Sequence, residues 1–297
     1  MMVLRRYKGK VGQALIYESY DRLLASWGTA YEQRTIETSY GATHIITAGS
    51  PNHPPLVLLH GTADNSAMMW VYNAKALSEK FYIIAIDAVG GSGKSEPNQA
   101  YYRDFVQEVW LDEILLAMQL EKVHIAGVSY GAYLAYHYAI MRPEKVDKVI
   151  GMAGGVAGSQ LEVMLKMMKA FLPEALFPTE RSIRSLLRKL TGANYAVFES
   201  NKELMQHWFY LLKYFNNRSM TQHRLTIFNE KQLGSIRQHA LFLIGDQDIL
   251  SYYPKAIGRL ETNRLSYKII KGAGHAINHE QSDFINKEIT EYLCQYT

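Results

Sequence analysis

Short, fully apolar runs alternate with amphipathic stretches along the first half of the chain. An uninterrupted apolar run is typical of a strand that is buried on both faces of a parallel sheet. The intervening residues 66–79 and 101–120 are interpreted as helices, since apolar side chains recur there at helical spacing. This alternation implies right-handed crossovers and one mostly parallel sheet. The predicted strands cover residues 56–59, 81–86, 123–128 and 146–152.

The two ends of the chain add elements to this sheet. Residues 1–28 carry apolar side chains at helical spacing, which predicts a helix packed on its own domain rather than on a dimer partner or a membrane surface. Two strands joined by a turn follow at residues 31–38 and 42–48. Near the C-terminus we expect strands at residues 240–244 and 265–270 and helices at 253–260 and 281–293.

The strand at residues 123–128 leads into the motif Gly-Val-Ser-Tyr-Gly, which has the Gly-x-Ser-x-Gly pattern of a nucleophile elbow. A serine on so sharp a strand-to-helix turn is held in strained torsions that lift its hydroxyl clear of the sheet. Gly127 and Gly131 leave the space that the turn needs. The helix that follows directs its N-terminal N–H groups at the site of a developing oxyanion. The alternative is a glycine-lined turn around an ordinary serine at residue 129.

A second loop supplies the rest of a predicted oxyanion hole. His60-Gly61-Thr62 follows the strand at residues 56–59, and a glycine there lets the backbone turn over the sheet edge. We expect the backbone N–H groups of Thr62 and Tyr130 to hold the oxyanion. His60 is interpreted as a structural residue that ties the loop by a hydrogen bond. The next apolar side chains are expected to wall an acyl pocket, with simple core packing as an equal alternative: Met68, Met69 and Trp70.

The alternation of predicted strands and helices ends after residue 155. Residues 156–228 are helical in pattern, and apolar side chains gather on single faces there, such as Leu161, Met164, Leu165 and Met168. A second such face carries Leu204, Trp208, Leu211 and Leu212. We interpret the segment as a helical lid whose apolar faces cover the mouth above Ser129, or alternatively as an extension of the core. The core domain would then comprise residues 1–155 and 229–297.

A serine hydroxyl is too weakly acidic to attack an ester by itself, so it needs a base and the base needs an orienting carboxylate. His275 stands on a glycine-flanked loop after the strand at residues 265–270, and Asp246 and Asp248 follow the strand at residues 240–244. The order serine, acid, histidine is the one expected for the α/β-hydrolase fold.

These motifs together resemble those of serine α/β-hydrolases, and more narrowly those of the bacterial naproxen-esterase-type carboxylesterases. The resemblance spans roughly residues 31–295 and implies Ser129 as nucleophile, His275 as general base and Asp248 as acid. Asp246 stays open as the acid, although the family's spacing favours Asp248. The oxyanion loop reads His-Gly-Thr and not His-Gly-Gly-Gly, so esters of tertiary alcohols are less expected. The matching pieces are His60-Gly61, residues 87–95, 127–131, 245–248 and 272–275.

The resemblance implies a serine carboxylesterase that hydrolyses small to medium apolar or aromatic esters through an acyl-enzyme, without a metal or organic cofactor. The same triad could cleave a carbon–carbon bond, a lactone, a thioester or a peptide, because pocket contacts decide the chemistry. A ligand receptor that has kept the fold is the alternative from another class. Haloalkane dehalogenases and epoxide hydrolases are disfavoured, since they need a carboxylate at residue 129.

Composition narrows the class of protein further. A net charge of +4 over 297 residues is too small and too scattered to indicate a nucleic-acid binder. The single cysteine, Cys294, excludes an intrachain disulfide and a cysteine-based zinc site. The N-terminal residues lack the apolar run of a signal peptide, and no later segment is apolar enough to span a bilayer. We therefore expect a cytoplasmic protein without stable membrane insertion, while its oligomeric state stays open.

One motif misleads. Gly93-Lys94-Ser95 resembles the end of a phosphate-binding P-loop. That motif requires a glycine five residues before Gly93, and Ala88 stands there. We interpret the loop as a glycine-rich turn after a strand rather than as an ATP site.

Overall fold

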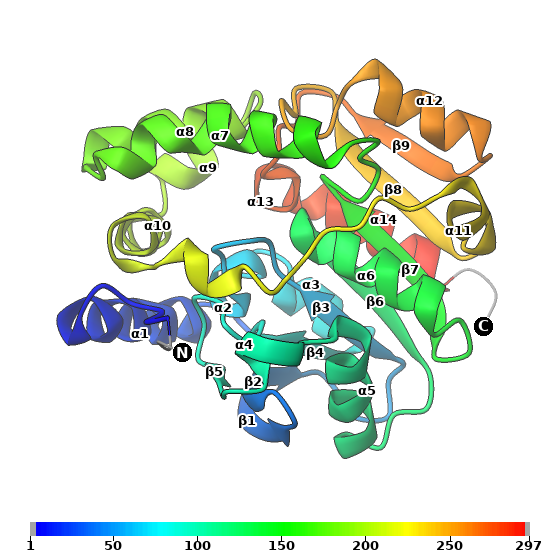
Figure 1. The fold of residues 1–297 in the computed structure, drawn as a ribbon, viewed down its shortest axis with the longest axis horizontal. Helices are drawn as coiled ribbons and strands as arrows, with labels where there is room; N and C mark the ends of the chain where they lie inside the picture. The colour runs from blue at the N-terminus through cyan, green and yellow to red at the C-terminus, as the bar shows by residue number, and fades with distance from the viewer. Residues whose placement is uncertain (1–3, 295–297) are drawn as a thin grey trace.

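One mixed sheet forms the centre of the molecule, within residues 4–294 that the computed structural model describes. Its nine strands follow the order β1-β2-β4-β3-β6-β7-β8-β9, with β5 paired to β2 (Figure 1). The strands are β1 (Tyr31–Thr38), β2 (Gly41–Ala48), β3 (Pro55–Leu59), β4 (Tyr82–Ile86), β5 (Glu96–Pro97), β6 (Val123–Val128), β7 (Val146–Met152), β8 (Ala240–Gly245) and β9 (Ser266–Ile270).

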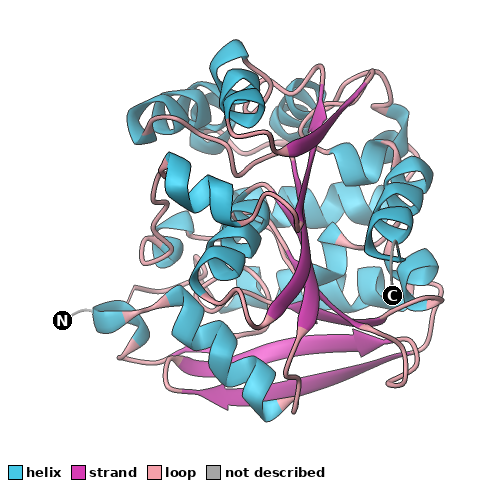
Figure 2. Ribbon diagram, turned by 90° about the vertical axis from the view of Figure 1, so that its right-hand side faces the viewer, coloured by secondary structure: helices cyan, strands magenta, loops and turns pink. Residues whose placement is uncertain are grey.

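The six strands β4, β3, β6, β7, β8 and β9 run parallel, whereas β1 and β2 add an antiparallel hairpin at one edge and β5 pairs antiparallel with β2. Every residue of β4, β6 and β8 is buried, as expected for strands covered by helices on both faces. Figure 2 shows the sheet nearly edge-on with helices on either side. The predicted α/β class with a mostly parallel sheet is confirmed, and the two-residue strand β5 is an addition that the sequence did not predict.

The observed helices differ from the predicted ones mainly because two of the predicted helices are interrupted. Residues 66–79 form two short helices, and residues 101–120 are interrupted where Phe105 and Val106 adopt extended torsions. The helices are α1 (Lys10–Ala25), α2 (Ser66–Met69), α3 (Ala74–Ser78), α4 (Tyr101–Asp104), α5 (Gln107–Ala117), α6 (Tyr130–Met141), α7 (Gln160–Leu176), α8 (Glu180–Leu190), α9 (Ala196–Glu199), α10 (Lys202–Tyr214), the 3-10 helix η1 (Asn217–Met220), α11 (Glu230–Ser235), α12 (Pro254–Thr262), α13 (Ile277–Glu280) and α14 (Ser282–Cys294).

Helix α1 packs on its own chain, as predicted. Ile16, Tyr20 and Leu23 are fully buried. Its partner is α10, which comes from the segment between β7 and β8: the Ser19 hydroxyl lies 2.7 Å from His207 Nδ1. Figure 1 shows α10 beside α1. The N-terminal helix therefore joins the sheet domain to the inserted helices.

Residues 156–220 contain α7, α8, α9, α10 and η1 and residues 221–228 contain no helix, and the two apolar faces do not both lie where the sequence analysis expected. The face of α10 with Leu204 and Leu211 is buried, and α10 packs along α1. Most of the predicted α7 face, including Leu161 and Leu165, is exposed to solvent, and of its four residues only Met164 lines the cavity above Ser129. Helical periodicity identifies an apolar face but not the surface that it meets, so the expectation for α7 holds at Met164 and not along the rest of the face.

Among residues 4–294, none of the helices combines the length and the apolar character needed to cross a bilayer.

Candidate active site

Ser129 stands at the corner between β6 and α6, in the strained geometry expected of an elbow. Its φ is 56° and its ψ is −114°, and its N–H donates a hydrogen bond to the carbonyl of Met152 at 2.8 Å. The neighbouring glycines leave no room for a side chain. A Cβ on Gly127 would lie 2.2 Å from the Gly131 carbonyl oxygen, and one on Gly131 would lie 2.1 Å from that of Leu59. The turn around Ser129 therefore requires glycine on both sides.

Replacing Gly131 by alanine should destabilise the fold by at least about 3 kcal/mol, because the new methyl meets backbone of β3 that cannot yield. Urea unfolding measures the loss. Gly258→Ala in α12 is the matched control, since a Cβ there meets nothing within 4 Å and alanine favours helix over glycine by about 1 kcal/mol. Equal stabilities of the two variants would contradict this description of the elbow.

Three side chains from separate parts of the chain meet at the elbow. Nε2 of His275, from the loop after β9, lies 3.0 Å from the Ser129 hydroxyl oxygen. Nδ1 of the same ring lies 3.0 and 3.1 Å from the two carboxylate oxygens of Asp248, from the loop after β8. The Asp248 side chain is fully buried and the His275 side chain is 13% exposed. This is the arrangement in which a serine can pass its proton to an oriented imidazole.

Hydrogen bonds and neighbouring charges set the protonation states of Asp248 and His275. Burial opposes the charged form of Asp248. The charge and N–H of His275 and donors in the loop from Leu250 to Ser251 outweigh burial and hold the carboxyl's pKa below its usual value. Burial likewise opposes the charged form of His275, but the charge and hydrogen bond of Asp248, together with the charges of Asp64 and Glu280, outweigh burial and raise the imidazole pKa. The carboxylate therefore stays ionised and stabilises an imidazolium next to Ser129.

Asp246, the other candidate acid, lies away from the imidazole contact. Its Oδ1 accepts the backbone N–H of Gly272 at 2.8 Å, and so ties the loop after β8 to the loop that carries His275. The geometry thus brings Asp248 and not Asp246 to the histidine.

Thr62 and Tyr130, the two predicted oxyanion donors, both line the cavity that contains Ser129. Tyr130 is the first residue of α6, so its N–H has no partner within the helix. Thr62 is exposed and lines the same cavity as Ser129 and Tyr130. The Tyr130 ring is anchored separately, because its hydroxyl donates to the side-chain oxygen of Gln107 at 2.6 Å. The assignment of these two backbone N–H groups as oxyanion donors stays a prediction.

His60 fastens the oxyanion loop, as interpreted from the sequence. Its ring donates from Nδ1 to the Gly61 carbonyl at 2.8 Å and accepts the Ala88 N–H at Nε2, at 2.9 Å. Burial lowers the pKa of this imidazole and so favours the neutral ring, which can donate from Nδ1 and accept at Nε2. The ring thus links the loop after β3 to the loop after β4.

Asp64 is a residue of the same loop that the sequence analysis did not single out. It is buried, its Oδ1 has no hydrogen-bond partner among the described residues, and its Oδ2 lies 2.8 Å from the position of a Cβ on Gly61. Burial raises the pKa of Asp64 to about 7, and the charge of His275 opposes that rise. The carboxyl therefore couples electrostatically to the imidazole.

The prediction that Met68, Met69 and Trp70 wall the pocket is wrong. All three are buried in the core at 0–3% exposure, and none lines the cavity next to Ser129. The carbonyls of Met68 and Met69 accept hydrogen bonds from His279 and Asn278, which pins the short helix α2 to α13. All four residues of α2 are buried, so this short helix is covered on every side and its apolar side chains belong to the core.

A cavity of about 540 Å³ opens above Ser129 and His275. Its walls come mainly from the start of α7 and the chain just before α11, which both lie in the segment predicted as a lid, and from the loop after β8, which the sequence analysis did not assign to a pocket. No periodic pattern marks these loop residues in the sequence. Apolar side chains predominate among them: Tyr133, Val156, Val163, Met164, Met167, Leu225, Ile227, Phe228, Leu250 and Tyr253.

The loop with Gly93-Lys94-Ser95 is bound to the buried carboxylate of Asp87 and not shaped as a phosphate cradle. The Lys94 N–H donates to Asp87 Oδ2 at 2.8 Å, and the Ser95 hydroxyl donates to the Asp87 carbonyl at 2.6 Å. A Cβ on Gly93 would lie 2.2 Å from the Asp87 carboxyl carbon. The glycine thus makes room for a structural carboxylate, in agreement with the interpretation as a turn.

Comparisons with known proteins place the chain among hydrolases. Carboxylesterase YbfK of Bacillus subtilis (strain 168) is 26% identical over 283 residues, which are 94% of this chain and 93% of YbfK. The uncharacterized carboxylesterase nap of the same strain is 26% identical over 294 residues, covering 93% of this chain and 91% of nap. The crystal structure of carboxylesterase CesB (YbfK) superposes with a TM-score of 0.81 at 24% identity, over 97% of this chain and 100% of CesB.

These relatives confirm the resemblance that the five motifs carried. The family model for the alpha/beta hydrolase fold matches residues 54–282, from β3 to the start of α14. That range contains the elbow, both loops of the candidate oxyanion hole and the loops with Asp248 and His275. The chain therefore belongs to the α/β-hydrolase fold family.

Proposed function

We propose that this protein is a serine carboxylesterase that works through an acyl-enzyme. The observation that carries the proposal is the continuous contact from Asp248 through His275 to Ser129 at the base of an apolar cavity. His275 takes the Ser129 proton while the serine attacks the ester carbonyl, and the N–H groups of Thr62 and Tyr130 hold the oxyanion. The alcohol leaves with the proton from His275, and water then repeats the sequence on the acyl group.

The relatives support the ester as the bond that is cleaved. YbfK and nap are both named as carboxylesterases, and each matches this chain over nine-tenths of both lengths. The cavity supports an apolar acyl or alcohol group of small to medium size. Val163, Met167 and Phe228 contribute to its walls, and about 540 Å³ leaves room for an aromatic ring.

We also propose that residues 156–228 act as a lid on a core of residues 1–155 and 229–297. The start of α7 and the chain at residues 224–228 line the cavity above Ser129, so any motion of the segment would change access to the serine. The cytoplasmic location predicted from the sequence stays a prediction.

A short-chain nitrophenyl ester tests the proposal against a receptor that has kept the fold. The purified chain should release nitrophenol far beyond one equivalent, with an initial burst if deacylation is the slow step. Release that stops at one equivalent per chain would contradict turnover. A panel of acyl and alkyl esters, lactones and thioesters then ranks the substrate classes by kcat/KM.

The pH dependence of kcat/KM should reveal the raised pKa of His275. The imidazole must be neutral to accept the serine proton, so activity should be full at high pH and fall as the pH drops through the imidazole pKa. Because Asp248 raises this pKa, the midpoint should lie above about 6.5, the ordinary value for histidine. A midpoint at or below that value would contradict the electrostatic coupling.

The same profile tests the role of Asp64. Its negative charge is one of the influences that raise the His275 pKa, so Asp64→Asn should move the midpoint to lower pH while leaving the activity at high pH within about tenfold. Asp246→Asn is the matched control, since Asp246 contacts a backbone N–H and not the imidazole. Equal midpoints in the Asp64 variant and the wild type would show that the carboxyl is uncharged throughout.

A further inference from the structure

The loop after β9, which carries the candidate general base, lies against the inserted helical segment as well as against the sheet. Residues 190–194 connect α8 to α9 and run beside this loop, and we call them the α8–α9 strap. The N–H of Ala193 donates to the carbonyl of Gly272 at 2.7 Å. The N–H of Ala276 donates to the carbonyl of Leu190 at 3.0 Å. The strap therefore holds the backbone on both sides of the histidine.

The strap and the histidine loop approach so closely that glycine is required where they meet. A Cβ on Gly192 would lie 2.2 Å from the Gly272 carbonyl oxygen. A Cβ on Gly274 would lie 2.5 Å from the Leu190 carbonyl oxygen. Both obstacles are backbone atoms, so no side-chain rotation could relieve either clash. The glycine just before His275 thus makes room for a part of the inserted segment.

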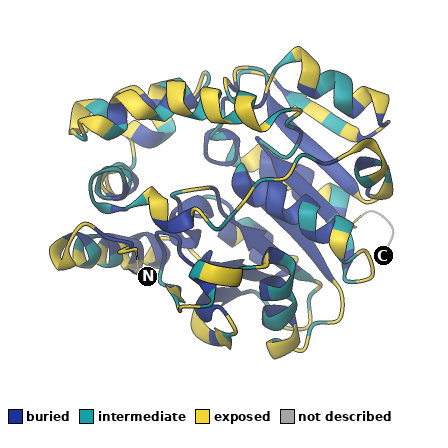
Figure 3. Cartoon of the chain, viewed as in Figure 1, coloured by how far each residue is buried: buried dark blue, intermediate teal, exposed yellow. Residues whose placement is uncertain are grey.

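Glu280, the last residue of α13, joins the strap to the histidine loop. Its Oε2 accepts the Gly192 N–H at 2.6 Å, and its Oε1 accepts the Gly274 N–H at 2.9 Å. Its backbone carbonyl accepts a hydrogen bond from the Asn194 side chain at 2.8 Å. All four residues of α13 are buried (Figure 3). One buried carboxyl group therefore bridges the inserted segment and the residue before His275.

Glu280 fits this place as a carboxylate. Each of its two oxygens accepts a backbone N–H, as an ionised carboxyl group can. Burial raises the pKa of Glu280, and the backbone N–H groups oppose that rise. Three negative charges raise the pKa of His275, and Glu280 supplies one of them beside Asp248 and Asp64. Glu280 therefore acts on the imidazole both through the backbone and through its charge.

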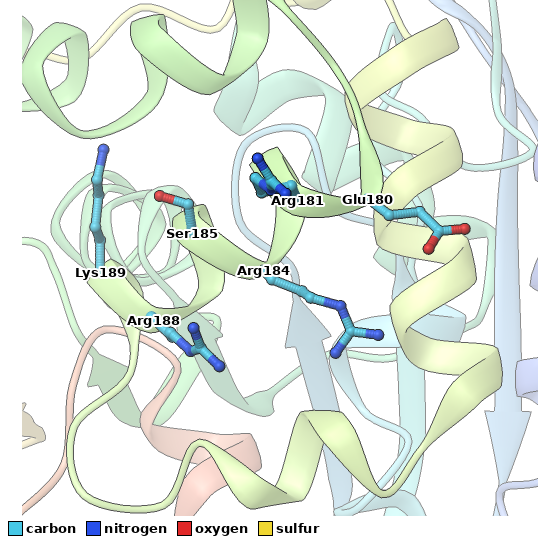
Figure 4. Close-up of a pocket in the computed structure, with 6 residues that line it drawn as sticks. All are labelled: Glu180, Arg181, Arg184, Ser185, Arg188 and Lys189. Atoms are coloured by element: carbon cyan, nitrogen blue, oxygen red, sulfur yellow. The ribbon is translucent and has the colours of Figure 1, made fainter.

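Helix α8, which leads into the strap, is itself held by its neighbours. Figure 4 shows Lys189 and Arg188 on different sides of this helix. Lys189 pairs with the buried Glu174 of α7 at 2.6 Å, and Arg188 lies 3.5 Å from Glu199 of α9. Leu190, where the helix ends, is buried. The strap therefore continues from a helix that is packed against the rest of the inserted segment.

We propose that the α8–α9 strap and Glu280 position His275 for catalysis, so that the inserted segment takes part in the reaction and does more than cover the cavity. Their contacts fix the backbone around the histidine and so keep Nε2 at 3.0 Å from the Ser129 hydroxyl oxygen. Glu280 is a positioning residue, because it acts through His275. The proposal rests on the serine carboxylesterase function and deepens it, since a lid that moved as one body would carry the histidine loop with it.

Hydrogen exchange of the wild-type chain tests whether the strap stays closed in solution. Four amides donate hydrogen bonds across the contact: Gly192, Ala193, Gly274 and Ala276. They should exchange at least about 10³-fold more slowly than unprotected amides. The measurement needs neither an ester nor a variant, so it does not depend on the proposed function. Exchange of these amides near the unprotected rate would overturn the proposal.

Gly192→Ala tests whether the strap acts on catalysis. The new methyl meets the Gly272 carbonyl and forces the two segments apart. The kcat per folded molecule for a short-chain nitrophenyl ester should fall at least about tenfold, with KM within about threefold, because misplacing a reacting group by about 1 Å can cost about 10²-fold. Gly158→Ala is the matched control in the same segment, since a Cβ there meets only the Arg259 side chain, at 3.6 Å, and Gly158 does not line the cavity. Equal kcat values in the two variants would contradict a positioning role for the strap.

Glu280→Gln gives a second variant of nearly unchanged shape. A glutamine oxygen can accept only one of the two N–H groups, and its NH₂ would face the other. We expect kcat per folded molecule to fall at least about tenfold, with KM within about threefold. The pH midpoint of kcat/KM should also move to lower pH, because Asp248 and Asp64 alone would then raise the pKa of His275.

Glu288→Gln is the matched control for this variant, because it neutralises another buried carboxylate, which pairs with Lys268 of β9. It should keep the wild-type kcat and midpoint. A purely structural Glu280 would lower only the amount of folded protein in Glu280→Gln. A wild-type kcat per folded molecule together with a wild-type midpoint in Glu280→Gln would therefore overturn the proposal.

The rate of fluorophosphonate labelling separates a failure of this proposal from a failure of the esterase function. The Ser129 oxygen displaces fluoride from phosphorus while His275 takes the serine proton, so labelling needs the positioned pair but no ester. Labelling should slow in Glu280→Gln and Gly192→Ala by about the same factor as kcat. If the wild-type chain is labelled but does not turn over esters, the proposed function fails, while slower labelling of the variants still supports the strap. Equal labelling rates in the wild type and both variants would overturn the strap proposal, whatever the chain hydrolyses.

Discussion

Replacing Ser129 by alanine should lower kcat for a nitrophenyl ester by about 10⁴-fold or more and leave the protein folded. The serine oxygen is the atom that His275 Nε2 approaches at 3.0 Å, so its removal deletes both the nucleophile and the proton that the imidazole takes. Alanine is smaller than serine and fits the same corner. The residual rate would come from the oxyanion donors and from substrate binding.

Covalent labelling provides a second measurement of the same assignment. A fluorophosphonate should add one phosphonyl group to the wild-type chain, at Ser129, and none to the alanine variant. Ser235→Ala in α11 is the control, because this exposed serine bonds only locally, to the carbonyl of Gln232. Activity of Ser129→Ala within tenfold of wild type, or labelling at a different serine, would contradict the mechanism.

The sequence predicted the sheet and the candidate triad well for a common reason. Parallel strands bring their carboxyl ends to one edge of the sheet, so residues that follow different strands converge there regardless of their separation in the chain. Ser129 follows β6, Asp248 follows β8 and His275 follows β9, and these strands lie in one sheet with β7 between the first two. The pattern of parallel strands in the sequence therefore already predicted that these three side chains meet at one edge of the sheet.

The wrong predictions concern what a helix face or a side chain contacts, not where the helices and strands lie. The apolar spacing of Leu161, Leu165 and Met168 correctly indicated one face of a helix, but burial depends on a partner that local sequence does not encode. For Met68 and Met69 the error was the reverse, because side chains predicted to line the cavity are buried in the core. Their nearness to the oxyanion loop in sequence did not mean exposure to the cavity. The cavity walls come from three distant segments, and no short motif identifies such a set.

Asp248→Asn should lower kcat by about 10⁴-fold, whereas Asp246→Asn should change it by less than about tenfold. The buried Asp248 carboxylate accepts the Nδ1–H of His275 and the N–H groups of Leu250 and Ser251. An asparagine there would keep its oxygen on the backbone donors and turn its NH₂ toward Nδ1. The imidazole would then carry its proton on Nε2 and could not accept the Ser129 proton. Asp246, in contrast, accepts the Gly272 N–H, which an asparagine oxygen can still accept.

The pH profile of the residual activity separates this explanation from a loss of stability. Asp248 is the strongest of the influences that raise the His275 pKa, so its neutral replacement should lower the imidazole pKa and move the midpoint of kcat/KM to more acidic pH. A variant that was merely less stable would lose amplitude at every pH and keep the wild-type midpoint. If Asp246→Asn instead produces the larger loss together with the acidic shift, the acid of the triad is Asp246. Because both residues follow the same strand, the paired variants differ in the contact to His275 far more than in their position in the fold.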